Sequence, residues 1–268
     1  MRQSLAYIRT SAGDPFRISS FVYAVGLAGL GGVNAVLGSL TPAEPLPHWL
    51  APETGAVAAI ALATLLAGLL VAWRPASAAA AGALSAYYLI IVALLMDGWG
   101  LLRDYGSYGA YFGFVEGLAL GVAALSIYAG RAPISPATAA ALGRAGRYAF
   151  ALCAVFFGGA HFVYAAYTAS LVPQWLPPSP LFWAYATGCF QIAAGFALLA
   201  NILARPAVLL LTTMYALFTP LVHLPLLFSN PAKHFYWTEN AMNIALTGAA
   251  WVIADALAIA PARRRRRI

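Results

Sequence analysis

Long apolar segments alternate with short polar segments along almost the whole chain. Each apolar segment has about 20 residues, the length that a helix needs to cross the hydrocarbon core of a bilayer. Within these segments apolar residues do not alternate with polar ones, which excludes a transmembrane β-barrel. The pattern predicts an all-α polytopic membrane protein with eight transmembrane helices. The expected spans are residues 18–38, 54–73, 76–96, 110–130, 146–168, 182–203, 206–228 and 236–257.

The composition agrees with a membrane protein and argues against a nucleic-acid-binding one. Hydrophobic residues make up 62% of the chain and charged residues 9%, whereas a soluble domain carries about 25% charged residues. The net charge is +7, but five of the fifteen Lys and Arg residues form one run at 263–267. A nucleic-acid-binding surface needs a basic stripe on a folded face. We therefore expect membrane lipids as partners and no nucleic acid.

The basic residues also predict the orientation in the membrane. With the eight spans above, thirteen of the fifteen Lys and Arg residues fall on the side of the two termini, and only Arg103 and Lys233 fall on the other side. Basic residues accumulate in cytoplasmic loops. The pattern predicts a multi-pass protein of a bacterial-type cytoplasmic (inner) membrane, with both termini in the cytoplasm.

Three sequence features recur in the same order in the two halves of the chain, which indicates a tandem duplication. The matched pairs are Pro-x-Trp-Leu-x-Pro at 47–52 and 173–178, Arg-Pro-Ala at 74–76 and 205–207, and a glutamate after aromatic residues at Glu116 and Glu239. Because each unit has an even number of spans, the two repeats would be parallel, related by an axis along the membrane normal. The expected segments are a cytoplasmic N-terminal segment 1–17, repeat 18–130, a cytoplasmic linker 131–145, repeat 146–257 and an Arg-rich cytoplasmic tail 258–268.

Several polar side chains lie at similar depth in the outer half of the predicted spans. A charge inside a membrane costs about 2.5–3.5 kcal/mol on insertion scales, so such groups persist where they find partners or have a function. His161, His223 and Glu116 are our candidates for proton handling or ligand binding, since both side-chain types can titrate near neutral pH. The alternative is structural, with each histidine bonded to a neighbouring Tyr, Asn or carbonyl group. The candidate substrate-binding residues are Tyr164, Trp175, Gln191, Glu239 and Asn243.

We expect His161 and His223 to face one outer-leaflet cavity inside the second repeat, with Gln191, Trp175 and Asn243 nearby. Lipid-facing imidazole groups would lack hydrogen-bond partners, at a cost of several kcal/mol. A haem bound by the two histidines is a geometric alternative. The chain contains no zinc or nucleotide motif, and no metal site is expected.

The two cysteines are expected to be unpaired, buried thiols. Cys153 lies near the inner end of its span and Cys189 in the outer half of the next one. Their depths differ by about 10 Å at a rise of about 1.5 Å per residue, which is too far for a disulfide. Buried thiols of this kind act as small apolar side chains.

Motifs in the second half resemble the DoxX/DoxD-like membrane family. They are Gly159-Ala160-His161-Phe162, the segment Leu171-Val172-Pro173-Gln174-Trp175-Leu176-Pro177, and Gly188-x-x-Gln191-x-x-x-Gly195. The resemblance covers residues 146–257 and is weak in the first half. It implies a four-helix unit in a respiratory membrane, and one branch of the family forms the membrane subunit of a thiosulfate:quinone oxidoreductase. Gln191 stands where relatives often have Glu, and an amide cannot act as an acid or base.

Three functions follow as hypotheses. The first is a quinone-linked respiratory or sulfur-redox membrane subunit with an outer-leaflet site, in which quinone is the bound cofactor and a redox partner subunit supplies electrons, since no redox cofactor site is evident in the chain itself. The second is a non-catalytic scaffold or assembly protein of an envelope complex. The third is a lipid-pocket binder or isomerase-like enzyme, because helical sterol isomerases also use intramembrane His and Glu.

Overall fold

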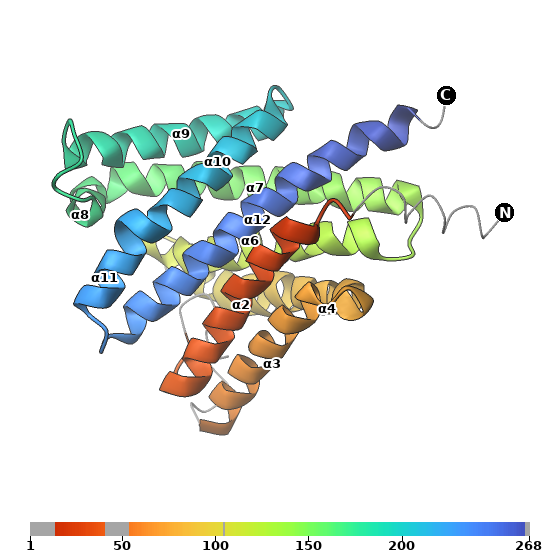
Figure 1. Cartoon of the computed structure of the whole chain (residues 1–268), viewed down its shortest axis with the longest axis horizontal. Helices are drawn as coiled ribbons and strands as arrows, with labels where there is room; N and C mark the ends of the chain where they lie inside the picture. The colour runs from red at the N-terminus through yellow and green to blue at the C-terminus, as the bar shows by residue number, and fades with distance from the viewer. Residues whose placement is uncertain (1–13, 41–53, 104, 266–268) are drawn as a thin grey trace.

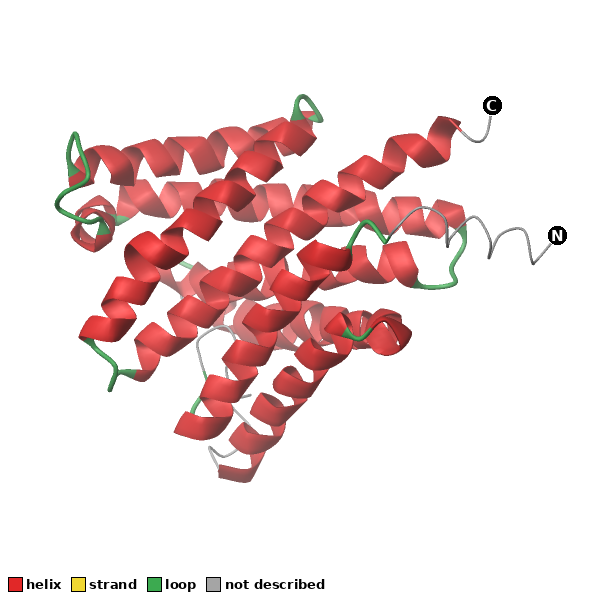
Figure 2. Ribbon diagram, in the orientation of Figure 1, coloured by secondary structure: helices red, strands yellow, loops and turns green. Residues whose placement is uncertain are grey.

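The computed structural model describes residues 14–40, 54–103 and 105–265, and all regular secondary structure in these ranges is helical (Figures 1 and 2). Eight helical stretches are long and apolar enough to cross a membrane, which confirms the predicted all-α polytopic fold. The first loop motif, at 47–52, lies outside the described residues. The elements are α2 (Arg17–Leu37), α3 (Thr54–Ala72), α4 (Arg74–Ala86), η1 (Tyr87–Asp97), α5 (Gly98–Arg103), η2 (Tyr108–Ala110), α6 (Tyr111–Arg131), α7 (Pro136–Val163), α8 (Ala165–Leu171), α9 (Pro180–Ala200), α10 (Ala204–Phe218), η3 (Thr219–His223), α11 (Leu224–Ser229) and α12 (His234–Arg265).

Two helices extend further than the apolar pattern predicts. Helix α7 begins at Pro136, inside the segment predicted to be a linker. The Ser135 hydroxyl accepts a hydrogen bond from the Thr138 amide at 3.1 Å, and proline occupies the first turn, two features that favour a helix start. Helix α12 continues to Arg265, so most of the predicted tail is helical as well. The α7 extension is rich in alanine but is separated from the apolar span by Arg144 and Arg147, and the α12 extension ends in a run of arginines, so a span of about 20 apolar residues includes neither.

The helices form one bundle in which α6 and α12 lie at the centre (Figure 1). In the first half α2 packs on α3, α3 on α4, and both α4 and η1 on α6. In the second half α7 packs on α9, α9 on α10, and α10 on α12. Contacts of α12 with α2, of α6 with α7, and of α6 with α12 join the halves. Helix α12 therefore packs mainly against the first half, and α6 packs against both halves to a similar extent.

The third span of each half changes from α-helix to π-helix at a matching place. Tyr87, the first residue of η1, lies 13 residues after Arg74, and Thr219, the first of η3, lies 14 residues after Arg205. Pro220 accounts for the change in η3, because it cannot donate to the carbonyl four residues earlier and its ring pushes against it. This match and the repeated order of helix contacts support the duplication, which stays a prediction.

The two halves are joined most closely where α2 crosses α12. A Cβ atom added to Gly248 would lie 2.2 Å from the backbone nitrogen of Tyr23, and one added to Gly26 would lie 2.2 Å from that of Ala245. Small residues let transmembrane backbones approach to this degree. The glycines of α2 and α12 therefore determine how the halves fit together.

A buried ion pair fixes the end of the bundle where α2 begins. The Arg131 guanidinium lies 2.7 Å from the Asp14 carboxylate and also donates to the Ser20 hydroxyl at 2.8 Å. It bonds further to Ser77 at the start of α4 and to the Val71 carbonyl at 3.4 Å. One side chain of α6 thus binds α2, α3 and α4 together.

Candidate functional site

A cavity of about 730 Å³ lies in the half of the bundle formed by the later helices. Its walls come from α6, α7, α9, α10, η3 and α12, and its mouth is bordered by α8 and the segment that follows α8. This is the end of the bundle opposite to the start of α2 and the end of α12 (Figure 1). Most of the lining is apolar, and the volume falls in the range of about 300–1,000 Å³ found for small-molecule sites.

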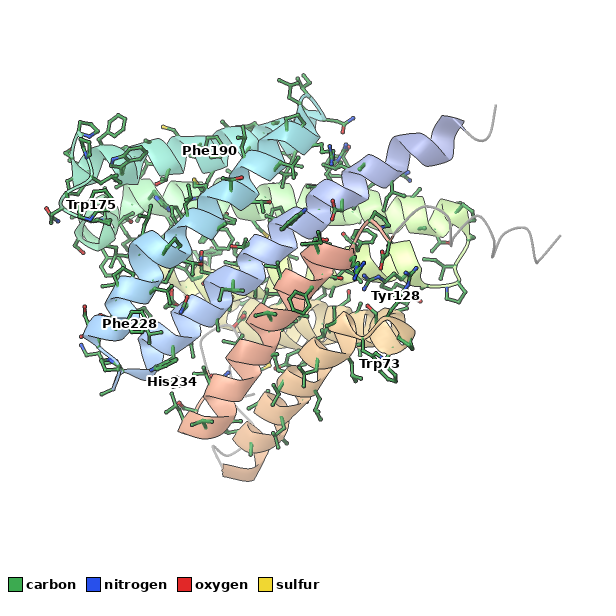
Figure 3. The ribbon with its side chains drawn as sticks, viewed as in Figure 1. Trp73, Tyr128, Trp175, Phe190, Phe228 and His234 are labelled. Carbon is green, nitrogen blue, oxygen red and sulfur yellow. The ribbon has the colours of Figure 1, made fainter. Side chains whose placement is uncertain are left out.

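The cavity brings together seven of the eight residues singled out from the sequence. Trp175 is the exception: it is 72% exposed and lies at the edge of the bundle, between α8 and α9 (Figure 3). Trp183 lines the cavity in its place, and its indole N–H donates to the Pro177 carbonyl at 2.9 Å. The candidates that line the cavity are Glu116, Tyr164, His161, Gln191, His223, Glu239 and Asn243.

Both ring nitrogens of His161 are engaged in hydrogen bonds. The Gln191 amide nitrogen donates to Nε2 of His161 at 2.9 Å. An amide nitrogen cannot accept, so the His161 proton is on Nδ1. From there it is directed at the Thr187 hydroxyl at 2.9 Å and the Ala184 carbonyl at 3.1 Å. His161 is therefore a neutral, fully paired histidine, as in the structural alternative considered above.

The network continues from Gln191 to α10. The Tyr215 hydroxyl donates to the Gln191 side-chain oxygen at 3.1 Å, and Gln191 itself is only 1% exposed. Sequence reasoning missed Tyr215 and Thr187, although helical spacing contains the signal. Tyr215 precedes His223 by eight residues, about two turns, and Thr187 precedes Gln191 by four, so each pair lies on one helix face.

Asn243 of α12 supports the place where α10 becomes π-helical. Its amide nitrogen donates to the Tyr215 carbonyl at 2.9 Å and to the Thr219 hydroxyl at 2.8 Å. The Tyr215 carbonyl is one of the acceptors in the last turn of α10, where Pro220 interrupts the regular pattern. Asn243 thus fixes the position of η3, and with it the position of His223.

Besides the hydroxyl groups of Tyr164 and Tyr167, three titratable side chains of the cavity have no hydrogen-bond partner within the described part of the chain. They are Glu116 on α6, His223 at the end of η3, and Glu239 on α12. Two carboxyl groups and an imidazole therefore face the same mainly apolar space from three helices. Groups of this kind can donate or accept protons, and they can hydrogen-bond to a polar group of a ligand.

The two cysteines differ in their exposure. Cys153 and Cys189 are both free thiols, but Cys189 is exposed, so the prediction of two buried thiols is wrong for Cys189. The buried face of α9 carries Ala184, Gly188 and Gln191, and Cys189 lies about 100° around the helix from Gly188.

No group of three or more His, Cys, Asp or Glu residues that could hold a metal occurs in ranges 14–40, 54–103 and 105–265.

The chain was compared with protein-family models, with curated proteins and with solved structures, and none of the three comparisons gives a match. The similarity to the DoxX/DoxD-like family thus rests on the motifs around His161, Trp175 and Gln191. The function of the cavity has to be argued from the groups that line it.

Proposed function

We propose that the cavity binds the ring of a membrane-soluble quinone and that this integral membrane protein is a quinone-linked redox subunit. The observation that carries the proposal is the unpaired trio of Glu116, His223 and Glu239 facing a largely apolar space of about 730 Å³. Apolar walls suit a quinone ring and the first part of its isoprenoid tail. The imidazole and carboxyl groups suit its two carbonyl oxygens.

The chemistry assigned to the trio is proton transfer. Reduction of a quinone to a quinol takes up two electrons and two protons. The electrons would come from a reduced partner subunit, and the protons would pass through Glu116, His223 and Glu239. His161 holds Gln191 in place at the cavity wall through the bond between the Gln191 amide nitrogen and its own Nε2.

A second function uses the same three side chains for proton transfer alone, without electron transfer. Moving a double bond in a lipid needs one group that removes a proton and another that returns it, and His223 with either glutamate meets that need. The favouring observation is that the imidazole and both carboxyl groups facing the cavity are proton-transfer groups. The distinction from the first function therefore lies in the ligand: a quinone for the redox subunit, an unsaturated sterol or similar lipid for the isomerase.

The test is a titration of the detergent-purified protein with a short-tailed ubiquinone analogue. Quinones quench tryptophan fluorescence, and Trp183 lines the cavity. We expect saturable quenching in the wild-type protein and its loss in Trp183→Phe, with binding to Trp183→Phe retained in equilibrium dialysis. Absence of saturable binding contradicts the proposal. Lipid extraction from the same preparation separates the two functions, since an unsaturated sterol in place of quinone supports isomerisation.

A further inference from the structure

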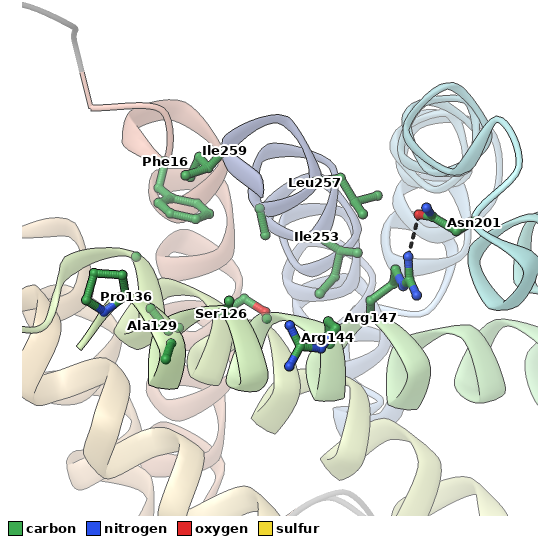
Figure 4. Close-up of a pocket in the computed structure, with 16 residues that line it drawn as sticks. Phe16, Ser126, Ala129, Pro136, Arg144, Arg147, Asn201, Ile253, Leu257 and Ile259 are labelled. Atoms are coloured by element: carbon green, nitrogen blue, oxygen red, sulfur yellow. Dashed lines mark hydrogen bonds between the residues drawn. The ribbon is translucent and has the colours of Figure 1, made fainter. Parts of the chain in front are cut away.

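A second hollow lies at the opposite end of the bundle, where α2 begins and α12 ends (Figure 4). It has a volume of about 730 Å³ and is bounded by the end of α6, the first turns of α7, the last turns of α12 and the turn between α9 and α10. Figure 4 shows Arg144 and Arg147 on α7 facing this space, with Ile253 and Leu257 of α12 across from them. We call it the arginine groove.

The groove exists because α7 presents small side chains toward α12. Pro136, Ala140 and Gly143 follow one another at intervals of four and three residues and line the space together with the arginines. A Cβ atom added to Gly143 would meet no atom within 4 Å. The two helices therefore leave an apolar slot between them at this end, whereas α2 and α12 are in backbone contact further along.

The groove lies at the level of the lipid headgroups. The 28 residues of α7 span about 42 Å at about 1.5 Å per residue, and the hydrocarbon core is only about 30 Å thick. The excess of about 12 Å corresponds to about the first eight residues of α7, so Arg144 lies at the edge of the apolar core and Arg147 about one turn deeper, from where a long basic side chain can reach the headgroups. By the positive-inside rule this end faces the cytoplasmic leaflet.

Two positive charges in the groove lack a negative partner. Arg147 donates a hydrogen bond to the Asn201 side-chain oxygen, and its guanidinium lies 4.5 Å from the centre of the Tyr148 ring. Its Nε is buried and has no hydrogen-bond partner within the described ranges. Arg144 has no partner there either, and the one ion pair found in those ranges joins Arg131 to Asp14. The groove is thus ready for an anion.

We propose that the arginine groove binds an anionic phospholipid, with the phosphate between Arg144 and Arg147 and an acyl chain along Ile253 and Leu257. A guanidinium group matches a phosphate in charge and geometry, and basic pockets between transmembrane helices on the cytoplasmic side bind acidic headgroups. The apolar wall of α12 favours a lipid over a soluble phosphate, which would leave that wall in water. This site is separate from the quinone cavity and does not depend on its function.

The test measures lipid binding to the full-length purified protein by native mass spectrometry. The probes are phosphatidylglycerol and phosphatidylcholine with identical palmitoyl and oleoyl chains. We expect the wild-type protein to prefer phosphatidylglycerol, and Arg144→Gln/Arg147→Gln to lose about fivefold in its affinity for each arginine removed. Arg17→Gln/Arg74→Gln removes the same charge from exposed positions at the same end and should keep the preference.

A second variant tests the groove without changing its charge. Gly143→Leu places a side chain in the empty slot, where nothing obstructs it, and should weaken phosphatidylglycerol binding while leaving the protein folded. Equal wild-type affinity for the two lipids overturns the proposal. So does an Arg17→Gln/Arg74→Gln loss as large as that of the groove variant, or unchanged binding in Gly143→Leu.

Discussion

The two sides of the central helices α6 and α12 are built from the same order of helix contacts but differ in what fills them. On the side of α2, α3, α4 and η1 large side chains pack against the central helices, and Tyr23, Leu27, Leu30 and Tyr88 are all 0% exposed. On the side of α7, α9 and α10 a cavity of about 730 Å³ remains. Large side chains thus lie between the helices on the first side, whereas the second side leaves room for a ligand.

Polar side chains bond across helices on both sides of the bundle, but those on the second side also line the cavity. On the side of α2, α3, α4 and η1, which we call the packed side, Tyr23 of α2 donates to the Leu120 carbonyl of α6 at 2.8 Å, and Arg131 of α6 donates to Asp14 and to Ser20 of α2. On the side of the cavity, polar side chains form a network across helices, from Thr187 through His161 and Gln191 to Tyr215. Because these four side chains line the cavity, their network orders part of its wall.

The largest expected loss of stability comes from disrupting the contact between α2 and α12. Gly248→Leu would place Cβ against the Tyr23 backbone, and neither backbone can yield without separating α2 from α12. We expect a loss of about 3 kcal/mol or more, seen as loss of monodisperse protein or a strongly lowered melting temperature in detergent. Gly32→Leu is the matched control, because a Cβ there meets nothing within 4 Å. Equal stability of the two variants would contradict the contact between the halves.

A smaller loss of stability is expected when the hydrogen-bond network around His161 is broken. Gln191→Leu removes the partner of His161 Nε2 and of the Tyr215 hydroxyl, and should cost about 2 kcal/mol of unfolding free energy. Cys189→Leu changes the same helix on its exposed face and should be close to neutral. If Cys189→Leu destabilises as much as Gln191→Leu, the network does not stabilise the bundle.

The third prediction separates binding from stability. His223→Ala should weaken the binding of the ubiquinone analogue about tenfold, the equivalent of about 1.4 kcal/mol, with the melting temperature unchanged, because its ring has no partner in the described protein. His234→Ala provides the comparison, since His234 bonds Ser39 and Asn34 and lines neither space. A tenfold loss in His234→Ala as well would show that the effect is not specific to the cavity.

The smallest effects come from single hydroxyl groups. Tyr23→Phe removes one bond to a carbonyl on the packed side and should cost about 0.6 kcal/mol. Tyr215→Phe should cost somewhat more, because the Gln191 oxygen loses its donor and the order of the network is disturbed. Chemical denaturation of the two variants in the same detergent measures the difference. A larger loss of unfolding free energy in Tyr23→Phe than in Tyr215→Phe would contradict the greater importance of the hydrogen-bond network on the side of the cavity.

The sequence predicts the spans well because the cost of burying polar groups in lipid imposes about 20 apolar residues on each helix. Arg144 and Arg147 interrupt the apolar pattern of α7 and hide its start at Pro136. Depth along each helix places His161, His223 and Glu116 at one level, but it carries no information on the direction of a loop, so Trp175 lies outside the cavity. The contact of Gly26 with Ala245 joins segments far apart in the chain, and nothing local indicates it.

The most direct test is a nitrogen-15 magnetic resonance spectrum of the histidine side chains, recorded in lipid nanodiscs with and without the ubiquinone analogue. The resonances are assigned with the single variants His161→Ala and His223→Ala. If His223 contacts the ligand and His161 serves the network, the His223 nitrogens shift on addition of quinone and His161 keeps its proton on Nδ1. A shift confined to His161, or no shift of either histidine at saturating quinone, would contradict the proposed site.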